Sequence, residues 1–184
     1  MNVRLYPKIS GDLAAGVDQF IAENFYAEGE RTPKLLAEEE EKFYSQPKAW
    51  LLAFENDQVI GTAALHQRKI QFNNQDIFLG GIGRVCTRKD RRRQGTANQM
   101  LKQAVKTLRT WGCDMAFICA NVKESGDLYT KVGFIPLDKP YTYSGRSGKL
   151  YEESNGMIAP INSFEIFEEV LHSAGKLHLG PGNW

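Results

Sequence analysis

Apolar residues recur three and four positions apart between residues 97 and 111, and this spacing places them on one face of a helix. The apolar positions are Ala97, Met100, Leu101, Ala104, Val105, Leu108 and Trp111. Gly95 stands just before this segment, and a β-forming run that ends at Thr87 precedes the basic turn leading into it. The pattern therefore predicts a strand, a basic turn and an amphipathic helix in succession.

The same periodicities predict further strands and helices on both sides of that unit. The expected strands span residues 3–6, 50–55, 59–70, 77–87, 115–120 and 155–161, and the expected helices begin near Gly11, Thr32, Ser125 and Ser163. Tight turns such as Asn56-Asp57 make the early strands antiparallel, whereas the strand–helix–strand unit over residues 83–120 predicts one parallel pair. We expect a mixed α/β fold in one domain over residues 1–184.

Side-chain directions follow from the same patterns. The helix after Thr32 is expected to turn Leu35, Leu36 and Phe43 inward and glutamates 38–41 outward, as a solvated face or, alternatively, as a collector of cationic substrates. The helix after Ser163 is expected to bury Phe164, Phe167, Val170 and Leu171. Gly80, Gly81 and Gly83 indicate a bulge in their strand or a ligand lying against its backbone, and we favour the ligand.

Composition limits the classes of function. The chain has 184 residues, of which 42% are hydrophobic and 24% charged, and a formal net charge of +1. This charge gives no reason to expect nucleic acid or a membrane surface as a partner, and the basic run 88–93 lacks aromatic residues to stack on bases. Three cysteines and three histidines show no metal-ligand spacing, so we expect reduced thiols and no metal site. With no signal-peptide pattern and no membrane-spanning run, we expect a cytoplasmic protein.

The basic turn has the chemistry of a phosphate cradle. The first N–H groups of a helix have no partner within the helix and lie at the positive end of its dipole. Gly95 has no side chain to block an approach to these groups, and Arg92 and Arg93 add full charges beside them. An ordinary strand–turn–helix with an exposed basic turn would show the same residues, so this stretch alone leaves both interpretations open.

Two motifs resemble those of GCN5-related N-acetyltransferases (GNATs). Arg92-x-x-Gly95-x-Ala97, following a strand that ends Val85-Cys86-Thr87, is similar to their acyl-CoA pyrophosphate signature, and Leu128-Tyr129-x-x-x-Gly133-Phe134 is similar to a second family segment. The resemblance implies a mostly antiparallel sheet with one central parallel pair splayed around CoA, and helices on both faces. It also implies acetyl-CoA as the cofactor, held by Val85, Cys86, Thr87, Arg92, Arg93, Gln94, Gly95, Thr96 and Ala97.

By the same resemblance, Tyr129 is the candidate general acid for the leaving thiolate, and packing beneath the cofactor is its alternative role. A tyrosine with a pKa of about 10 could protonate a thiolate with a pKa of about 8.5 at a cost of about 2 kcal/mol. Family members often place a glutamate on the strand before the phosphate motif, but Ile82, Gly83 and Arg84 supply no carboxylate. Arg84 is expected to be a cross-strand partner or a substrate contact.

The C-terminal part offers further acceptor-site candidates. The ending Gly-Pro-Gly-Asn-Trp is unlike a frayed tail, because an exposed tryptophan is costly in water. It weakly resembles the C-termini of aminoglycoside 2′-N-acetyltransferases, which implies that Trp184 lies in the substrate cleft and that its α-carboxylate binds or deprotonates the amine; docking on the surface is the alternative. Residues 138–154 are expected to form a mobile hairpin that, with Glu28 and Glu30, walls the acceptor site.

The favoured function is transfer of an acetyl group from acetyl-CoA to a primary amine of a small molecule, by direct attack in a ternary complex. Two other functions stay open. One is a CoA-binding regulator that has lost the chemistry, and the other is a protein N-acetyltransferase, which would need an open groove. A homodimer is possible, and neither nucleic acid nor a membrane is expected as a partner.

Overall fold

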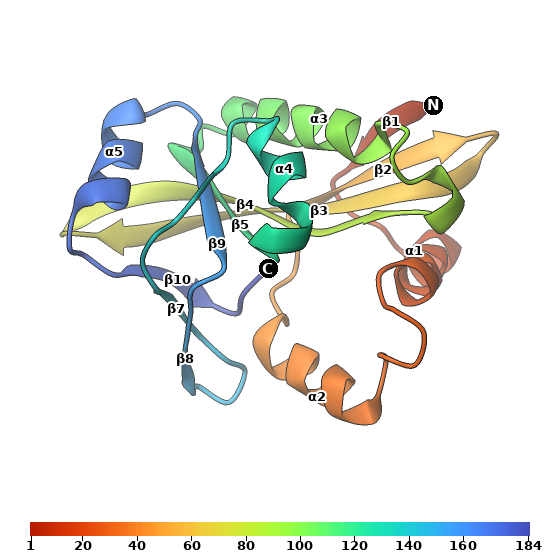
Figure 1. Cartoon of the computed structure of the whole chain (residues 1–184), viewed down its shortest axis with the longest axis horizontal. Coiled ribbons are helices and arrows are strands. Elements are labelled where there is room, and N and C mark those ends of the chain that lie inside the picture. Colours follow the sequence, from red (N-terminus) through yellow and green to blue (C-terminus); the bar gives the residue numbers. More distant parts are fainter.

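Residues 1–184 are all described by a computed structural model, and their centre is a seven-stranded sheet with the order β1-β2-β3-β4-β5-β9-β6 (Figure 1). The strands are β1 (Asn2–Tyr6), β2 (Ala49–Glu55), β3 (Gln58–Phe72), β4 (Gln75–Thr87), β5 (Met115–Cys119), β6 (Ile135–Pro136) and β9 (Gly156–Pro160). All neighbouring strands are antiparallel except β4 and β5, which are parallel. The expected sheet with one central parallel pair is confirmed.

Helices cover both faces of this sheet. They are α1 (Gly11–Asn24), α2 (Pro33–Lys42), α3 (Thr96–Thr110), α4 (Val122–Thr130) and α5 (Phe164–His172). Figure 1 shows α3 and α4 on one face and α1 and α2 on the other. None of these helices combines the length and the apolar character needed to cross a membrane.

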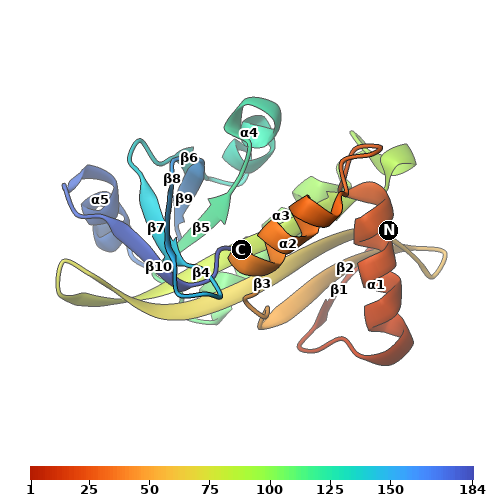
Figure 2. The ribbon, with the colours of Figure 1, turned by 90° about the horizontal axis from the view of Figure 1, so that it is seen from below.

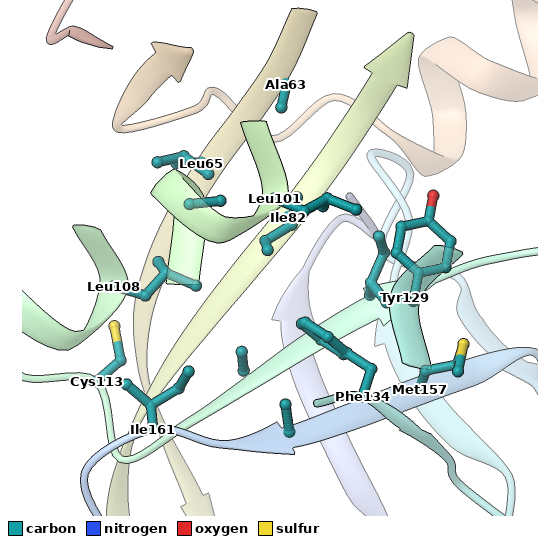
Figure 3. Packing of buried hydrophobic residues seen from close by; sticks show 14 of the residues in the cluster. Ala63, Leu65, Ile82, Leu101, Leu108, Cys113, Tyr129, Phe134, Met157 and Ile161 are labelled. Atoms are coloured by element: carbon teal, nitrogen blue, oxygen red, sulfur yellow. The ribbon is translucent and has the colours of Figure 1, made fainter. Parts of the chain in front are cut away.

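The predicted amphipathic helix forms the main packing layer on the first face. α3 begins directly after Gly95, and its buried residues include Met100, Leu101, Ala104 and Leu108. Leu101 and Leu108 pack with Ile82 of β4 in a cluster that extends to Tyr129 of α4 (Figure 3). This packing fixes the N-terminus of α3 beside the end of β4, where the basic turn joins them.

The parallel strands β4 and β5 are paired over a short stretch only. Leu79, Gly80 and Gly81 pair with Met115, Ala116 and Phe117, and the two strands part beyond this point. β4 also contains a bulge, because Ala64 lies opposite Gly83 whereas Thr62 lies opposite Cys86, so Arg84 and Val85 face a single residue of β3. Arg84 has a φ of +47° at this bulge. The β4 edge after Gly81 is therefore left without a strand partner in the middle of the sheet.

A second sheet of three strands was not foreseen from the sequence. β7 (Tyr141–Ser144) pairs antiparallel with β8 (Leu150–Glu153) and parallel with β10 (Leu177–Pro181). The hairpin expected within residues 138–154 is present, and the following tail forms a strand that carries the end of the chain over the central sheet (Figure 2). The backbone N of Ser147, at the tip of the hairpin, donates to Glu41 of α2 at 3.1 Å.

Two expected helix faces are wrong in part, since Leu35 and Leu171 do pack against the core. α2 buries no residue, and Leu36 is 37% exposed. Glutamates 38–41 are not a uniformly solvated face, because Glu39 and Glu41 accept hydrogen bonds from segments distant in sequence. In α5, Phe167 and Val170 are buried as expected, but Phe164 is 65% exposed and lies against the ring of Phe167 instead of entering the core.

Candidate active site

A groove of about 660 Å³, called here the α3 groove, runs past the N-terminus of α3 between β4 and α4. Its walls include eight of the nine residues expected to hold the cofactor, namely Val85, Cys86, Thr87, Arg92, Arg93, Gly95, Thr96 and Ala97. Gly95 has a φ of +86°, and a Cβ built on it would meet no atom within 4 Å. Gln94 is not among the lining residues, and its Nε2 donates to the carbonyl of Asp90 at 3.0 Å.

The arginines of the basic turn are held in different ways. Two form ion pairs, Arg88 with Asp90 at 2.7 Å and Arg91 with Glu55 at 2.6 Å. Arg92 donates to the carbonyls of Asn24 and Thr87, at 2.6 Å and 3.3 Å, and so ties the end of α1 to the end of β4. Arg93 also lines the groove but forms neither an ion pair nor a side-chain hydrogen bond. Its guanidinium therefore has its donors available for an anion in the groove.

The α3 groove has the chemistry that the expected cofactor requires. Two buried polar atoms of lining residues, Thr87 Oγ1 and Asn98 Oδ1, have no hydrogen-bond partner. On its side facing β5, β4 has no neighbouring strand from Ile82 to Thr87. An extended amide-containing arm could pair with this free edge as an added strand. Phosphate groups would meet the free N–H groups of α3 and the charge of Arg93. These residues fit acetyl-CoA.

An inner cavity of about 190 Å³ lies where β4 and β5 part. Gly83, Arg84 and Val85 of the bulge form one wall, with Ile118 and Cys119 of β5 opposite. The cavity shares Val85 and Phe25 with the α3 groove, so the two spaces adjoin. Tyr129 and Trp184, the two residues expected to be catalytic, both line this cavity. The structure thus brings together residues that are far apart in the sequence.

Tyr129 lies at the edge of the core. It is 7% exposed, its ring packs edge-on against Phe134, and its hydroxyl points away from Phe134 and Met157 (Figure 3). Burial raises the pKa of Tyr129 to about 12. Tyr129 is therefore protonated at neutral pH, but giving its proton to a thiolate with a pKa of about 8.5 would cost about 5 kcal/mol, more than an ordinary tyrosine would require.

A third space, called here the α2 groove, leads to the inner cavity from the side of α1 and α2 and has a volume of about 520 Å³. The residues that line both the α2 groove and the inner cavity are Tyr26, Glu39, Phe43, Ser45 and Arg84. The Tyr26 hydroxyl donates to Glu39 Oε2 at 2.7 Å, and burial together with this bond raises the pKa of Tyr26 to about 12. Arg84 forms no ion pair, so its guanidinium is unengaged in the passage between the two spaces.

Trp184 explains two of the glycines in β4. A Cβ built on Gly81 would lie 2.2 Å from Cε2 of Trp184, and one built on Gly83 would lie 2.8 Å from the carbonyl carbon of Trp184. A Cβ on Gly80 would instead meet Leu108 of α3 at 2.9 Å. These glycines make room for the chain's own atoms, namely side chains beside Gly80 and Gly81 and the backbone of Trp184 beside Gly83, so the favoured interpretation that they make room for a ligand is corrected.

His66 of β3 packs against the indole of Trp184. The imidazole is stacked on the indole, lines the inner cavity, and is 5% exposed. Burial, with the nearby charges of Arg68 and Arg84, lowers the pKa of His66 to about 3, so the ring is neutral. Its Nδ1 has no hydrogen-bond partner. Arg68 lies 4.1 Å from the indole centroid and donates to the carbonyls of Leu179 and Gly182, which fixes the strand that carries Trp184.

Two expected substrate contacts lie elsewhere. Glu28 and Glu30 are exposed on the loop after α1, where Glu30 accepts a hydrogen bond from the backbone N of Ala27 at 2.8 Å, and neither lines the inner cavity or the α2 groove. The carboxylate that lines both spaces belongs to Glu39. Sequence reasoning did not single out Tyr26, Glu39 or His66, and its one relevant signal was the glutamate run with its alternative reading as a collector of cations.

Comparison with known proteins agrees with this geometry. A family model described as an acetyltransferase (GNAT) domain matches residues 15–136. The chain belongs to the GNAT acetyltransferase family. N-alpha-acetyltransferase MAK3 of Arabidopsis thaliana is 28% identical to this GNAT chain over 102 residues, which are 54% of the chain and 52% of MAK3. The chain thus spans about half the length of this curated relative.

Solved structures share the GNAT fold. The N-acetyltransferase YhbS of Escherichia coli, in complex with CoA, has a TM-score of 0.62 at 18% identity, over 97% of this chain and 88% of that chain. A chain of the NatC complex bound to Gag peptide and CoA has a TM-score of 0.59 at 18% identity, over 87% of this chain and 99% of that chain. The GNAT family uses acetyl-CoA, which agrees with the chemistry of the α3 groove.

Proposed function

We propose that this GNAT chain transfers an acetyl group from acetyl-CoA to a primary amine of a small molecule, by direct attack in a ternary complex. The observation that carries the proposal is the meeting of two grooves at one inner cavity. Val85 joins the cavity to the α3 groove, whereas Glu39 and Arg84 join it to the α2 groove. A donor in the first groove and an acceptor in the second would bring their reacting ends together there, which supplies proximity and orientation.

The chain's own residues supply the proton transfers. When bound, acetyl-CoA supplies an acetyl thioester whose carbon–sulfur bond is exchanged for a carbon–nitrogen bond. Tyr129 lines the inner cavity and holds a proton at neutral pH, which it can give to the leaving sulfur; Tyr26 is also protonated there, but its hydroxyl is bonded to Glu39. The ammonium form of the acceptor must first lose a proton to a base or to water, because only the neutral amine is a nucleophile.

Trp184 is the second catalytic candidate. Its carbonyl carbon lies beside Gly83 at the wall of the inner cavity, so an α-carboxylate on Trp184 would lie close to the acceptor amine. Adding one residue after Trp184 is expected to lower turnover while acetyl-CoA binding is retained. Unchanged kinetics would limit Trp184 to its packing role.

The shape of the acceptor side favours a small molecule. The inner cavity where the amine would react has a volume of about 190 Å³, and the α2 groove that leads to it has about 520 Å³, within the range of roughly 300–1,000 Å³ of small-molecule pockets. The β7–β8 hairpin is tied to α2, because the backbone N of Arg146 donates to the carbonyl of Glu41 at 2.9 Å and the Arg146 guanidinium pairs with Glu40 at 3.3 Å. These contacts join two walls that would have to stand apart for a polypeptide to lie across the site.

A protein N-acetyltransferase is the second candidate function. It is favoured by the identity with MAK3 and by the likeness to a chain of the NatC complex, whose solved structure includes a peptide. Thiol release from acetyl-CoA, measured with a panel of small primary amines and a panel of peptides with free N-termini, separates the two. We expect kcat/KM to be at least about tenfold higher for the best small amine than for any peptide. A peptide that is acetylated faster than every small amine would overturn the small-molecule proposal.

A further inference from the structure

We infer that the acceptor is an amino-acid-like zwitterion, with its carboxylate bound by Arg84 and its ammonium group received by Glu39. This inference rests on the proposed acetyl transfer and names the chemical class of the acceptor. It follows from two oppositely charged groups that line the same passage between the α2 groove and the inner cavity without pairing with each other. A cavity that holds such separated charges selects a ligand that carries both.

Arg84 is presented to the passage by the bulge of β4. Its φ of +47° is uncommon for a residue with a long side chain, and its carbonyl is held by the Thr62 hydroxyl, which donates to it at 3.1 Å. No aspartate or glutamate lies within ion-pair distance of its guanidinium. The residue of β3 opposite the bulge is Ala63, so the Arg84 side chain has no polar partner across the strands, and the expected role as a cross-strand partner is not supported. A guanidinium in this position offers two parallel N–H donors, the geometry that matches a carboxylate.

A second unpaired cation lies along the same approach. The Arg31 guanidinium lines the α2 groove 5.9 Å from the ring centroid of Tyr26 and forms no ion pair. By contrast, Arg146 in this groove is engaged by Glu40 at 3.3 Å. The acceptor's path therefore carries two guanidinium groups whose charge is not neutralised by a neighbouring carboxylate, and this favours the entry of an anionic group.

Glu39 differs from the other members of the glutamate run. Glu38 pairs with Lys42 at 2.8 Å, Glu40 pairs with Arg146, and Glu41 accepts from the hairpin residue Ser147. Glu39 has no cationic partner, and its Oε2 accepts a hydrogen bond from the Tyr26 hydroxyl, which leaves Oε1 without one. Asp18 also lines the α2 groove, but it does not reach the inner cavity. Glu39 is thus the unpaired glutamate of the run that lies where an ammonium group must pass.

The two contacts balance the proton transfers of the reaction. The ammonium group gives one proton to Glu39, and the freed nitrogen attacks the acetyl carbon. The leaving sulfur takes a proton from Tyr129, and Tyr129 is restored by the proton that the new amide nitrogen releases. The proton on Glu39 returns to solvent, so the transfer produces an amide, a thiol and one free proton.

An acceptor without a carboxylate would meet a mismatched site. Its cationic amine would approach Arg84 with no anion between the two like charges, and the guanidinium would stay without a carboxylate partner. Charge-assisted hydrogen bonds of this kind correspond to about a ten- to hundredfold effect on an equilibrium or rate. The wild-type chain should therefore prefer an amino acid to the matching decarboxylated amine by about that factor.

The test compares acceptors that differ by one group. Thiol release is measured with phenylalanine, its primary amide and phenethylamine, and with leucine and isopentylamine, on the wild type and on Arg84→Gln, Glu39→Gln and Lys102→Gln. Lys102 is an exposed cation of α3 that lines none of the three spaces, so its variant controls for the loss of one charge. The affinity of each variant for acetyl-CoA shows whether its fold and its α3 groove are intact.

We expect Arg84→Gln to lower kcat/KM for the amino acids by about ten- to hundredfold and to change it by less than about threefold for the decarboxylated amines. Glu39→Gln should lower turnover of both the amino acids and the decarboxylated amines. Lys102→Gln should leave turnover of both classes unchanged. Equal loss for both classes in Arg84→Gln, or faster wild-type turnover of the decarboxylated amines, would overturn the inference. If no acceptor releases thiol, the proposed function fails. Calorimetric binding of the same acceptor pairs to the protein–CoA complex then tests the inference separately. Tighter binding of the amino acids supports it, and equal or no binding overturns it.

Discussion

The indole of Trp184 is stacked on the imidazole of His66, with the ring centroids 5.3 Å apart and the planes inclined by 14°. Both side chains are 5% exposed. The stack joins the C-terminal segment to the middle of β3 and forms part of the inner-cavity wall. The acceptor side of the candidate site is thus built by packing between segments more than a hundred residues apart. The titration of His66 and the packing of Trp184 can be tested separately.

His66 should make stability depend on pH. The unfolded chain takes up a proton at His66 near pH 6.5, whereas in the folded chain the pKa of His66 is lowered to about 3. Between these values the unfolded state binds more protons, so this contribution to stability is complete above about pH 6.5 and is lost as the pH falls, by up to about 1.4 kcal/mol per pH unit.

The measurement is the free energy of unfolding by denaturant between about pH 7 and pH 5, for the wild type and for His66→Phe. Phenylalanine keeps a ring against Trp184 but cannot titrate, so the variant should show a shallower fall in stability over this range. Identical slopes for the two proteins would contradict a buried, neutral His66.

Gly81 should resist substitution because Trp184 occupies the space beside it. A Cβ at Gly81 would lie 2.2 Å from the indole, so Gly81→Ala should displace the ring and destabilise the protein by about 1–3 kcal/mol. The matched control is Gly16→Ala in α1, where a Cβ meets nothing within 4 Å and should stabilise the helix by about 0.5–1 kcal/mol. Chemical unfolding measures both, and a Gly81→Ala protein as stable as the wild type would refute this packing.

Arg93 should contribute to the affinity for acetyl-CoA. Its guanidinium lines the α3 groove without an ion-pair partner, so Arg93→Ala should raise the Kd for acetyl-CoA by about tenfold, and the effect should shrink at high salt. Lys102→Gln serves as the control for charge. Calorimetry at two ionic strengths checks this, and an unchanged Kd for the Arg93 variant at low salt would remove Arg93 from the binding site.

Tyr129→Phe should separate chemistry from binding. The variant keeps the ring that packs against Phe134 and removes the proton donor, so kcat should fall by about 10²-fold while the Kd for acetyl-CoA is unchanged. Tyr6→Phe, a change on the edge strand β1, should leave both quantities as they are. If kcat stays within about twofold of the wild type, Tyr129 has only the packing role.

The elements of the donor side could be predicted because their signals are local. The three- and four-residue spacing of Met100, Leu101, Ala104 and Leu108 encodes α3 directly, and Gly95 marks its start with a conformation that favours glycine. The strands around the basic turn follow from composition and from their turns. Apart from Asn24 and Phe25 at the end of α1, the α3 groove is lined by one contiguous unit together with α4, so sequence order was enough to indicate most of its residues.

The acceptor side could not be predicted in the same way, because it is made by long-range contacts. Nothing near Glu39 in the sequence indicates that Tyr26 bonds to it, or that Arg84 shares a passage with it. Residues 177–181 form a strand only because β7 is available to pair with them. Gly81 and Gly83 signalled a close approach correctly, but a glycine pattern does not say which atoms approach, and here they belong to Trp184.

The central claim is that acetyl transfer to a small amine takes place where the two grooves meet. The most direct measurement mixes this protein with acetyl-CoA and one candidate amine under single-turnover conditions and quantifies CoA and the acetylated amine together by mass spectrometry. We predict equal amounts of the two products, formed by the wild type and strongly slowed in Tyr129→Phe. CoA formed without acetylated amine, or acetyl-CoA bound but not consumed with any amine or peptide, would contradict the claim.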